Sequence, residues 1–174
     1  MKLVRWKRFT WNLTALPPLA TNLPDYFLVR GVSRDEEKAV AHVVFTAFTL
    51  DTTWSDTLKI FRERLELGVH AAFARENVPA IIVAHGPRII AASVLSTELD
   101  AENNLISGPC VLPEYSNRGI GSALLHHSLK QLSEAGLNTA HAVTKENVPA
   151  AKFVYPKFGS TGLAHDYEPV LAGS

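Results

Sequence analysis

The sequence predicts a single α+β domain, in which a mixed, mostly antiparallel twisted sheet of about six or seven strands is flanked by about four helices. A chain of 174 residues has the length of one domain with a sizeable core. The hydrophobic period changes along the chain between that of helices and that of strands. Because strands and helices then follow one another in a mixed order, an α+β arrangement is favoured over an all-α or all-β one.

The composition excludes several classes of protein. The chain is 47% hydrophobic and 20% charged, and its 17 basic residues offset 17 acidic ones, so no net charge favours nucleic-acid or membrane partners. No apolar run reaches about eighteen residues, the length of a membrane span. The basic, aromatic N-terminus is a poor signal peptide, and the lone Cys110 forms no intrachain disulfide. We therefore expect a soluble, cytoplasmic protein.

Residues 1–25 differ in composition from the rest of the chain. Basic and aromatic side chains are mixed in its first eleven residues, and Pro17, Pro18 and Pro24 disfavour a helix. The segment is predicted to be an N-terminal arm in front of a domain of residues 26–174. We expect it to pack over the domain or against a partner subunit, which leaves a homodimer open, in preference to binding an acidic partner.

Spacing and turn residues predict the elements of the domain. The first half contains a strand at 26–32, a helix after the capping box Ser33-Arg-Asp-Glu36, a helical region from Trp54 to about 77 that breaks at Gly68, a hairpin of strands 80–84 and 88–95, and a strand at 105–112. The second half contains a helix at 119–135, a strand at 137–144, a short helix capped by Asn147 and ended by Pro156, and one or two strands within 160–171.

A loop with two glycines joins the strand at 105–112 to the helix at 119–135. The first backbone N–H groups of a helix lack partners and carry the positive end of its dipole, which suits a pyrophosphate. Gly119 and Gly121 have no Cβ, so the backbone can approach phosphate closely, and Arg118 and Ser122 can add contacts. The loop has neither the third glycine of a Rossmann fingerprint nor the Gly-Lys-Ser/Thr of a P-loop.

This segment resembles the acetyl-CoA motif of the GNAT superfamily, in which a strand ending in apolar-x-Val leads to Gln/Arg-x-x-Gly-x-Gly/Ala. The sequence here reads Cys110-Val111-Leu112-Pro113-Glu114-Tyr115-Ser116-Asn117-Arg118-Gly119-Ile120-Gly121. Downstream, Asn147 and Tyr155-Pro-Lys-Phe-Gly159 resemble the family's second motif, an Asn and then Tyr-x-Lys-x-Gly. Ser116 stands where the family usually has Gln or Arg, Asn147 lies one residue farther from Tyr155 than is usual, and Ser160 replaces an aromatic residue.

The resemblance implies a GNAT-like fold whose sheet is splayed at a bulge near Gly108-Pro109, with the pantetheine arm of acetyl-CoA in the opening. A proline within a strand marks an edge or a bulge independently of the resemblance, because it has no N–H to donate. The residues that the resemblance assigns to acetyl-CoA are Cys110, Val111, Ser116, Asn117, Arg118, Gly119, Ile120, Gly121, Ser122 and Asn147. No metal is expected, since neighbouring His126 and His127 point about 100° apart on a helix.

By the same resemblance, Tyr155 is the general acid that protonates the departing thiolate. A tyrosine suits this role, because its pKa near ~10 keeps the hydroxyl protonated. The general base is open among His141, Glu98, Asp51 and water, since the strands around the site contain no carboxylate. An acyl-cysteine at Cys110 is disfavoured, because no histidine is placed by sequence to activate the thiol.

We therefore expect an N-acetyltransferase that moves an acetyl group from acetyl-CoA to a primary amine of a small molecule or a protein N-terminus, by direct attack in a ternary complex. The acceptor pocket is expected to be built by the helical region 48–73 and by the strand ends that face Tyr155. Two alternatives stay open: a non-catalytic acyl-CoA sensor, and an interaction protein that acts through residues 1–25. Binding of acetyl-CoA distinguishes the enzyme and the sensor from the interaction protein, and turnover distinguishes the enzyme from the sensor.

Overall fold

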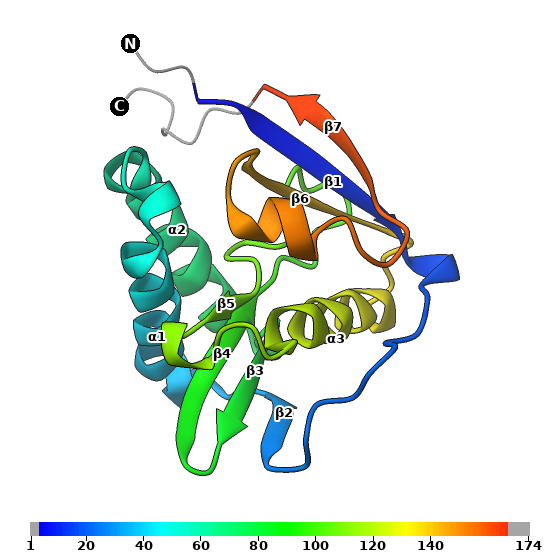
Figure 1. Ribbon diagram of the computed structural model, residues 1–174. Helices are drawn as coiled ribbons and strands as arrows, with labels where there is room; N and C mark the ends of the chain where they lie inside the picture. Colours follow the sequence, from blue (N-terminus) through cyan, green and yellow to red (C-terminus); the bar gives the residue numbers. More distant parts are fainter. Residues whose placement is uncertain (1–3, 167–174) are drawn as a thin grey trace.

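Two antiparallel sheets and three long helices make up the computed structural model, which describes residues 4–166 (Figure 1). The strands are β1 Trp6–Asn12, β2 Phe27–Gly31, β3 Ala80–His85, β4 Arg88–Val94, β5 Cys110–Val111, β6 Thr139–Lys145 and β7 Thr161–His165. The helices are α1 Glu37–Leu50, α2 Leu58–Phe73, α3 Ile120–Glu134 and the short π-helix Ala150–Val154. The α+β class is confirmed, but the strands divide between two sheets instead of forming one.

The larger sheet has the strand order β2-β3-β4-β5. The predicted hairpin is confirmed as β3 and β4, which turn at Gly86 with a left-handed φ of 59°. Helix α1 contacts β4 and β5, whereas α3 contacts β3 and β4. Residues 90–94 of β4 have no exposed surface, so the helices cover both faces of this sheet.

The smaller sheet has β1 at its centre, between β6 and β7. Trp6 lies opposite Lys145 on one side and His165 on the other. The expectation of an arm that packs over the domain is therefore corrected for residues 6–12, which form a central strand. Two basic residues between Trp6 and Phe9 interrupt the alternation that would have indicated a strand.

Helices α1 and α3 begin where the sequence predicts, whereas α2 begins at Leu58, four residues after the predicted start, and one expected break is absent. The Ser33 capping box is present, with the Ser33 N–H donating to Glu36 Oε1 at 3.1 Å. Helix α2 continues through Gly68, so the prediction of a break there is wrong. A Cβ at Gly68 would lie 2.5 Å from Ile106 Cγ2, and the glycine thus permits close packing instead of ending the helix.

The strand predicted at 105–112 is shorter than expected. Within this range, β5 pairs with β4, Leu105 forms an isolated bridge with Leu95, and the Ser107 N–H donates to Val94 O at 3.3 Å. Gly108 has a φ of 64°, and Pro109 has no N–H, so the ladder is interrupted at the position expected for a bulge.

The last elements also differ in detail from the prediction. Asn147 does not cap the π-helix, whose N-cap is Pro149 and which has no side-chain cap. The Tyr155 N–H donates to Ala150 O at 2.8 Å, the five-residue spacing of a π-helix. The final strand is β7, and residues 167–171 of the predicted range lie outside the described residues.

Asn104 connects the two sheets. Its backbone N–H donates to His141 O at 2.7 Å, and its Oδ1 accepts from the His141 N–H at 3.0 Å. Beyond this connection β5 and β6 belong to different sheets and are not paired with each other. Within residues 4–166, no helix is both long and apolar enough to cross a bilayer.

If β1 is a structural part of the core, Trp11→Ala lowers the free energy of unfolding by about 3–5 kcal/mol, the range for removing a buried Trp or Phe. Trp11 has no exposed surface, and its Nε1 donates to Lys157 O at 2.9 Å. Urea denaturation measures the change. The exposed Arg5, which directly precedes β1, provides the control, since Arg5→Ala should shift stability by less than about 0.5 kcal/mol. Equal, small effects in both variants would contradict the central position of β1.

Candidate active site

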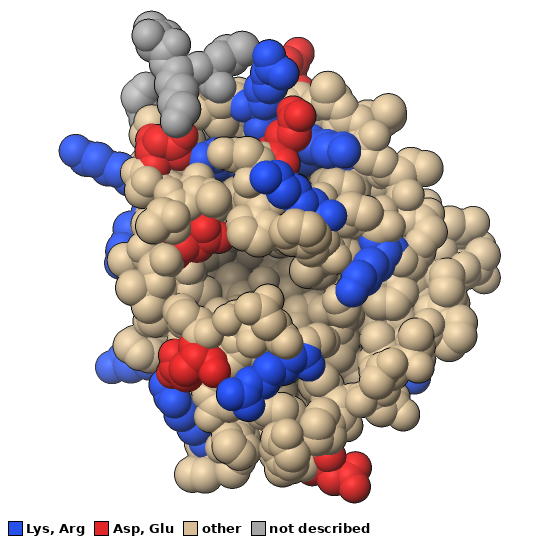
Figure 2. Space-filling view, viewed as in Figure 1, with Lys and Arg blue, Asp and Glu red and all other residues tan. Residues whose placement is uncertain are grey.

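A cleft of about 480 Å³ opens where the two sheets diverge. Its walls come from the end of α1, from β5, from the loop and first turn of α3, from β6 and from the π-helix. Figure 2 shows the same face as Figure 1, hollowed near its centre, with charged side chains around the hollow. The cleft therefore has the position that the sequence predicts for the pantetheine arm.

β5 is an edge strand of the larger sheet, so the backbone groups on one of its sides are not paired with another strand of that sheet. Leu112 N–H donates to Ile90 O at 3.0 Å, and the neighbouring Val111 lies opposite Ala91. In an antiparallel ladder hydrogen-bonded pairs alternate with non-bonded pairs, so the N–H and C=O of Val111 point away from β4. Because Val111 lines the cleft, these two backbone groups are placed to pair with the amides of an extended ligand.

The N-terminus of α3 forms one end of the cleft. Gly119 is its N-cap with a φ of 78°, and Asn117 has a φ of 62°. These left-handed residues turn the chain so that the first helical N–H groups, which have no intrahelical partners, lie at the cleft. Lys157 Nζ donates to Ser122 Oγ at 2.6 Å, which adds a cation beside the positive helix end. This end of the cleft suits an anion such as a pyrophosphate.

The structure gathers most of the residues predicted to bind acetyl-CoA. Cys110, Val111, Ser116 and Asn117 line the cleft, and so do Gly119, Ile120, Gly121 and Ser122. Arg118 and Asn147 are not among the lining residues. The Arg118 guanidinium instead lies over the Tyr115 ring at 5.3 Å and donates to Glu114 O at 3.4 Å, whereas Asn147 is exposed.

Tyr155 ends the π-helix and lines the cleft. Its ring packs against Phe9 and Trp11, with centroids 5.4 and 5.8 Å away, so β1 holds it in place. Burial, with a further contribution from Cys110, raises the pKa of the Tyr155 hydroxyl well above its ordinary value. The hydroxyl therefore stays protonated and can donate a proton.

Cys110 also lines the cleft, and its thiol is buried. Its Sγ donates to Ser107 O at 3.5 Å. Burial raises the pKa of the Cys110 thiol to about 12, so the nucleophilic thiolate is disfavoured. This environment agrees with the sequence argument against an acyl-cysteine.

Of the three side chains considered as the base, Asp51 alone lines the cleft. His141 lies on β6 three residues before Thr144, so it faces the opposite side of the sheet from that cleft-lining residue, and its Nδ1 is 2.9 Å from Thr10 Oγ1. Glu98 lies in a separate pocket beside α2.

Two residues that the structure places at the candidate site were not among the predicted site residues. Lys157 is the Lys of the Tyr-x-Lys-x-Gly motif, and that spacing was the signal that could have indicated it. Gly108 was predicted only as part of the bulge near Gly108-Pro109, without a contact to Tyr155. In the structure a Cβ at Gly108 would lie 2.0 Å from Tyr155 Oη, so the missing side chain makes room for that hydroxyl.

Comparison with known proteins identifies the family. The sequence model of the acetyltransferase (GNAT) family matches residues 42–159, well over half of the chain. The chain belongs to the GNAT family. The matched range contains the cleft loop, α3, β6 and Tyr155, whereas β1 lies before it. No curated protein matches the sequence.

Solved structures show the same GNAT fold. An acetyltransferase from the GNAT family of Colwellia psychrerythraea superposes with a TM-score of 0.64 at 18% identity, over 93% of this chain and 54% of that one. A GCN5-related N-acetyltransferase from Sphaerobacter thermophilus superposes with a TM-score of 0.62 at 16% identity, over 94% of this chain and 50% of that one. A GCN5-related glucosamine N-acetyltransferase region of a fungal multi-domain β-N-acetylglucosaminidase superposes with a TM-score of 0.58 at 16% identity, over 92% of this chain and 20% of that one. This GNAT chain thus spans about half the length of the first two.

The close approach of Gly108 and Tyr155 predicts that a side chain at position 108 destabilises the fold. Gly86, which also has a left-handed backbone, provides the control. Gly108→Ala and Gly86→Ala both place a side chain on a left-handed backbone, at a φ of 64° and 59°, but a Cβ at Gly86 meets nothing within 4 Å. Gly108→Ala should therefore lower the free energy of unfolding by about 1–3 kcal/mol more than Gly86→Ala, the range for overpacking. Chemical denaturation measures both, and equal losses would contradict the contact.

Proposed function

We propose that this GNAT protein is an N-acetyltransferase that moves an acetyl group from acetyl-CoA to a primary amine while both are bound. The observation that carries the proposal is the placement of the Tyr155 hydroxyl, buried and protonated, in the same cleft as the open edge of Val111 and the N-terminus of α3. A cytoplasmic location is part of the proposal, since the lone Cys110 is a buried free thiol.

The described residues suit acetyl-CoA, which when bound supplies the acetyl thioester and its thiol leaving group. The N-terminus of α3 and Lys157 would hold the pyrophosphate, because both present positive charge at one end of the cleft. The N–H and C=O of Val111 would pair with the pantetheine amides. In the transition state the oxyanion of the tetrahedral intermediate would take the Val111 N–H as its donor while the Val111 C=O keeps its pantetheine amide, since a fixed backbone donor needs no reorganisation.

The reaction requires a balanced movement of protons. The acceptor ammonium first loses a proton to Asp51 or water, and the neutral nitrogen attacks the carbonyl carbon of the thioester. A nitrogen–carbon bond forms, the carbon–sulfur bond breaks, and Tyr155 donates its proton to the sulfur. The new amide nitrogen loses a second proton, which restores the Tyr155 hydroxyl through solvent. The net products are the amide, free CoA and one proton.

Neither alternative function is favoured by a specific observation. An interaction protein acting through residues 1–25 would need a free arm, but residues 6–12 are the centre of a sheet. A sensor that only binds acyl-CoA would not need a proton donor, yet a buried, protonated Tyr155 lines the cleft.

Tyr155→Phe tests the proposal. Loss of the general acid should lower kcat for acetyl transfer by about 10²–10⁴, the usual contribution of general acid catalysis, with the Kd for acetyl-CoA unchanged. Release of free CoA, followed with a thiol reagent across a panel of amines, measures kcat. The control is Tyr26→Phe, because Tyr26 is 60% exposed and lies outside the cleft. If Tyr155→Phe keeps the wild-type kcat, Tyr155 is not the acid.

A further inference from the structure

The charges of the cleft are few and are distributed between two walls. Among the described residues that line it, the charged side chains are Asp51 and Lys157. Lys157 belongs to the end at α3, where it contacts Ser122. Asp51 directly follows α1 and belongs to the wall where the acceptor was expected. The cleft therefore has one cation at the end proposed for the phosphates of acetyl-CoA and one carboxylate on the wall that follows α1.

Asp51 is held in a fixed position. Its Oδ1 accepts from the Thr53 N–H at 3.0 Å and from Thr53 Oγ1 at 2.5 Å. Its backbone N–H donates to Ala47 O at 3.1 Å at the end of α1. Among the described residues no hydrogen bond reaches its second carboxylate oxygen, which leaves that oxygen available to a ligand.

The wall around Asp51 is apolar. Ala47, Phe48, Leu50 and Trp54 line the cleft beside it. Leu50 is 58% exposed, so a ligand that covers it removes apolar surface from water. The Trp54 ring is held by stacking on Phe61, with centroids 5.2 Å apart, and by an edge contact with Phe48 at 5.0 Å.

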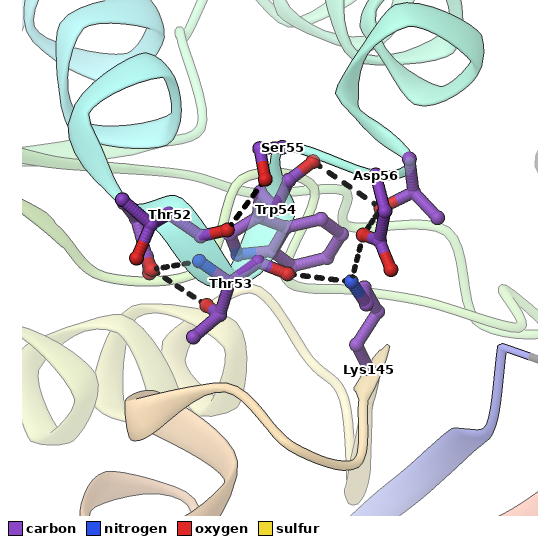
Figure 3. A network of polar contacts seen from close by, with 8 residues as sticks. Thr52, Thr53, Trp54, Ser55, Asp56 and Lys145 are labelled. Atoms are coloured by element: carbon purple, nitrogen blue, oxygen red, sulfur yellow. Dashed lines mark hydrogen bonds and ion pairs between the residues drawn. The ribbon is translucent and has the colours of Figure 1, made fainter. Parts of the chain in front are cut away.

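A buried lysine fixes this wall, as Figure 3 shows. Lys145 is 2% exposed, and its Nζ reaches from β6 to donate to Thr53 O at 2.5 Å and to the Asp56 carboxylate. The same Nζ lies 5.5 Å from the Trp54 ring. The hydrogen bond from Lys145 lowers the pKa of Asp56, so this carboxylate is ionised and already paired. Asp56 is therefore not available to a second cation of the acceptor.

We propose that the acceptor is a primary amine with a single positive charge on an apolar body, an arylalkyl or alkyl monoamine, a proposal that rests on the proposed acetyl transfer. Its ammonium binds the free oxygen of Asp51 before deprotonation, and its apolar body covers Leu50 and Trp54. Polyamines and aminoglycosides carry several cations and would leave all but one of them without a carboxylate in this cleft, at a desolvation cost.

The experiment compares acceptors in the wild-type protein. The probes are 2-phenylethylamine, 1,4-diaminobutane as a dication and glucosamine as a polar monocation. We expect kcat/KM for 2-phenylethylamine to exceed that of both others at least about tenfold, because both the charge and the apolar wall favour it. A preference for diaminobutane or glucosamine would overturn the acceptor class while leaving acetyl transfer intact. Absence of acetyl-CoA binding and of all turnover would instead overturn the proposed function.

Asp51→Asn tests the ammonium site directly. Asparagine keeps an oxygen for the two bonds from Thr53 but removes the charge. Calorimetry with CoA bound should show a Kd for 2-phenylethylamine raised about tenfold to a hundredfold, the value of a charge-assisted hydrogen bond, with the Kd for acetyl-CoA unchanged. The matched control is Asp25→Asn, because Asp25 is exposed and outside the cleft. An unchanged amine Kd with a lower kcat would assign Asp51 to proton abstraction alone and overturn the proposal.

A second variant keeps the proposal testable if Asp51→Asn is poorly folded. Leu50→Glu adds a carboxylate at an exposed position of the same wall. It should raise kcat/KM for 1,4-diaminobutane relative to 2-phenylethylamine, since the second cation then has a partner. An unchanged ratio would contradict the assignment of this wall to the acceptor.

Discussion

The separation of β5 from β6 is the constraint on which the site depends, and it begins at Gly108. A left-handed glycine followed by a proline ends the pairing that the preceding segment makes, so the two strands enter different sheets. Val111 is thereby left with backbone groups that face a cleft instead of a neighbouring strand. The same glycine makes room for the Tyr155 hydroxyl. One local backbone feature thus leaves the edge of β5 open to the cleft and makes room for Tyr155 beside it.

The N-terminal strand completes this arrangement from the far end of the sequence. β1 lies between β6 and β7, and Phe9 and Trp11 pack on the ring of Tyr155. Trp11 also binds the carbonyl of Lys157, whose ammonium reaches α3. Stability of the smaller sheet and geometry of the site are therefore coupled, although β1 lies before the range that matches the GNAT family.

Features that depend on neighbours in sequence were predictable, and those that depend on distant contacts were not. The Ser33 capping box, the turn at Gly86 and the glycine loop of α3 each follow from a few adjacent residues. The place of β1 depends on pairing with residues more than a hundred positions away, and its basic residues hide the strand pattern. Motif resemblance predicted the cleft-lining loop, but Arg118 faces Tyr115 instead of the cleft, which no spacing reveals.

The most direct test of the central claim is a calorimetric titration of the folded protein with acetyl-CoA, beside Gly121→Glu and Gly121→Gln. A Cβ at Gly121 would lie 3.7 Å from Val154 Cγ2 and 4.0 Å from Val111 Cγ2, which are ordinary van der Waals contacts, and the two variants differ from each other mainly in charge. We expect micromolar binding by the wild type, a weaker Kd for Gln, and none for Glu, whose charge repels phosphate at the helix N-terminus. No binding by the wild type, or equal affinity in all three, would contradict a cofactor site in this cleft.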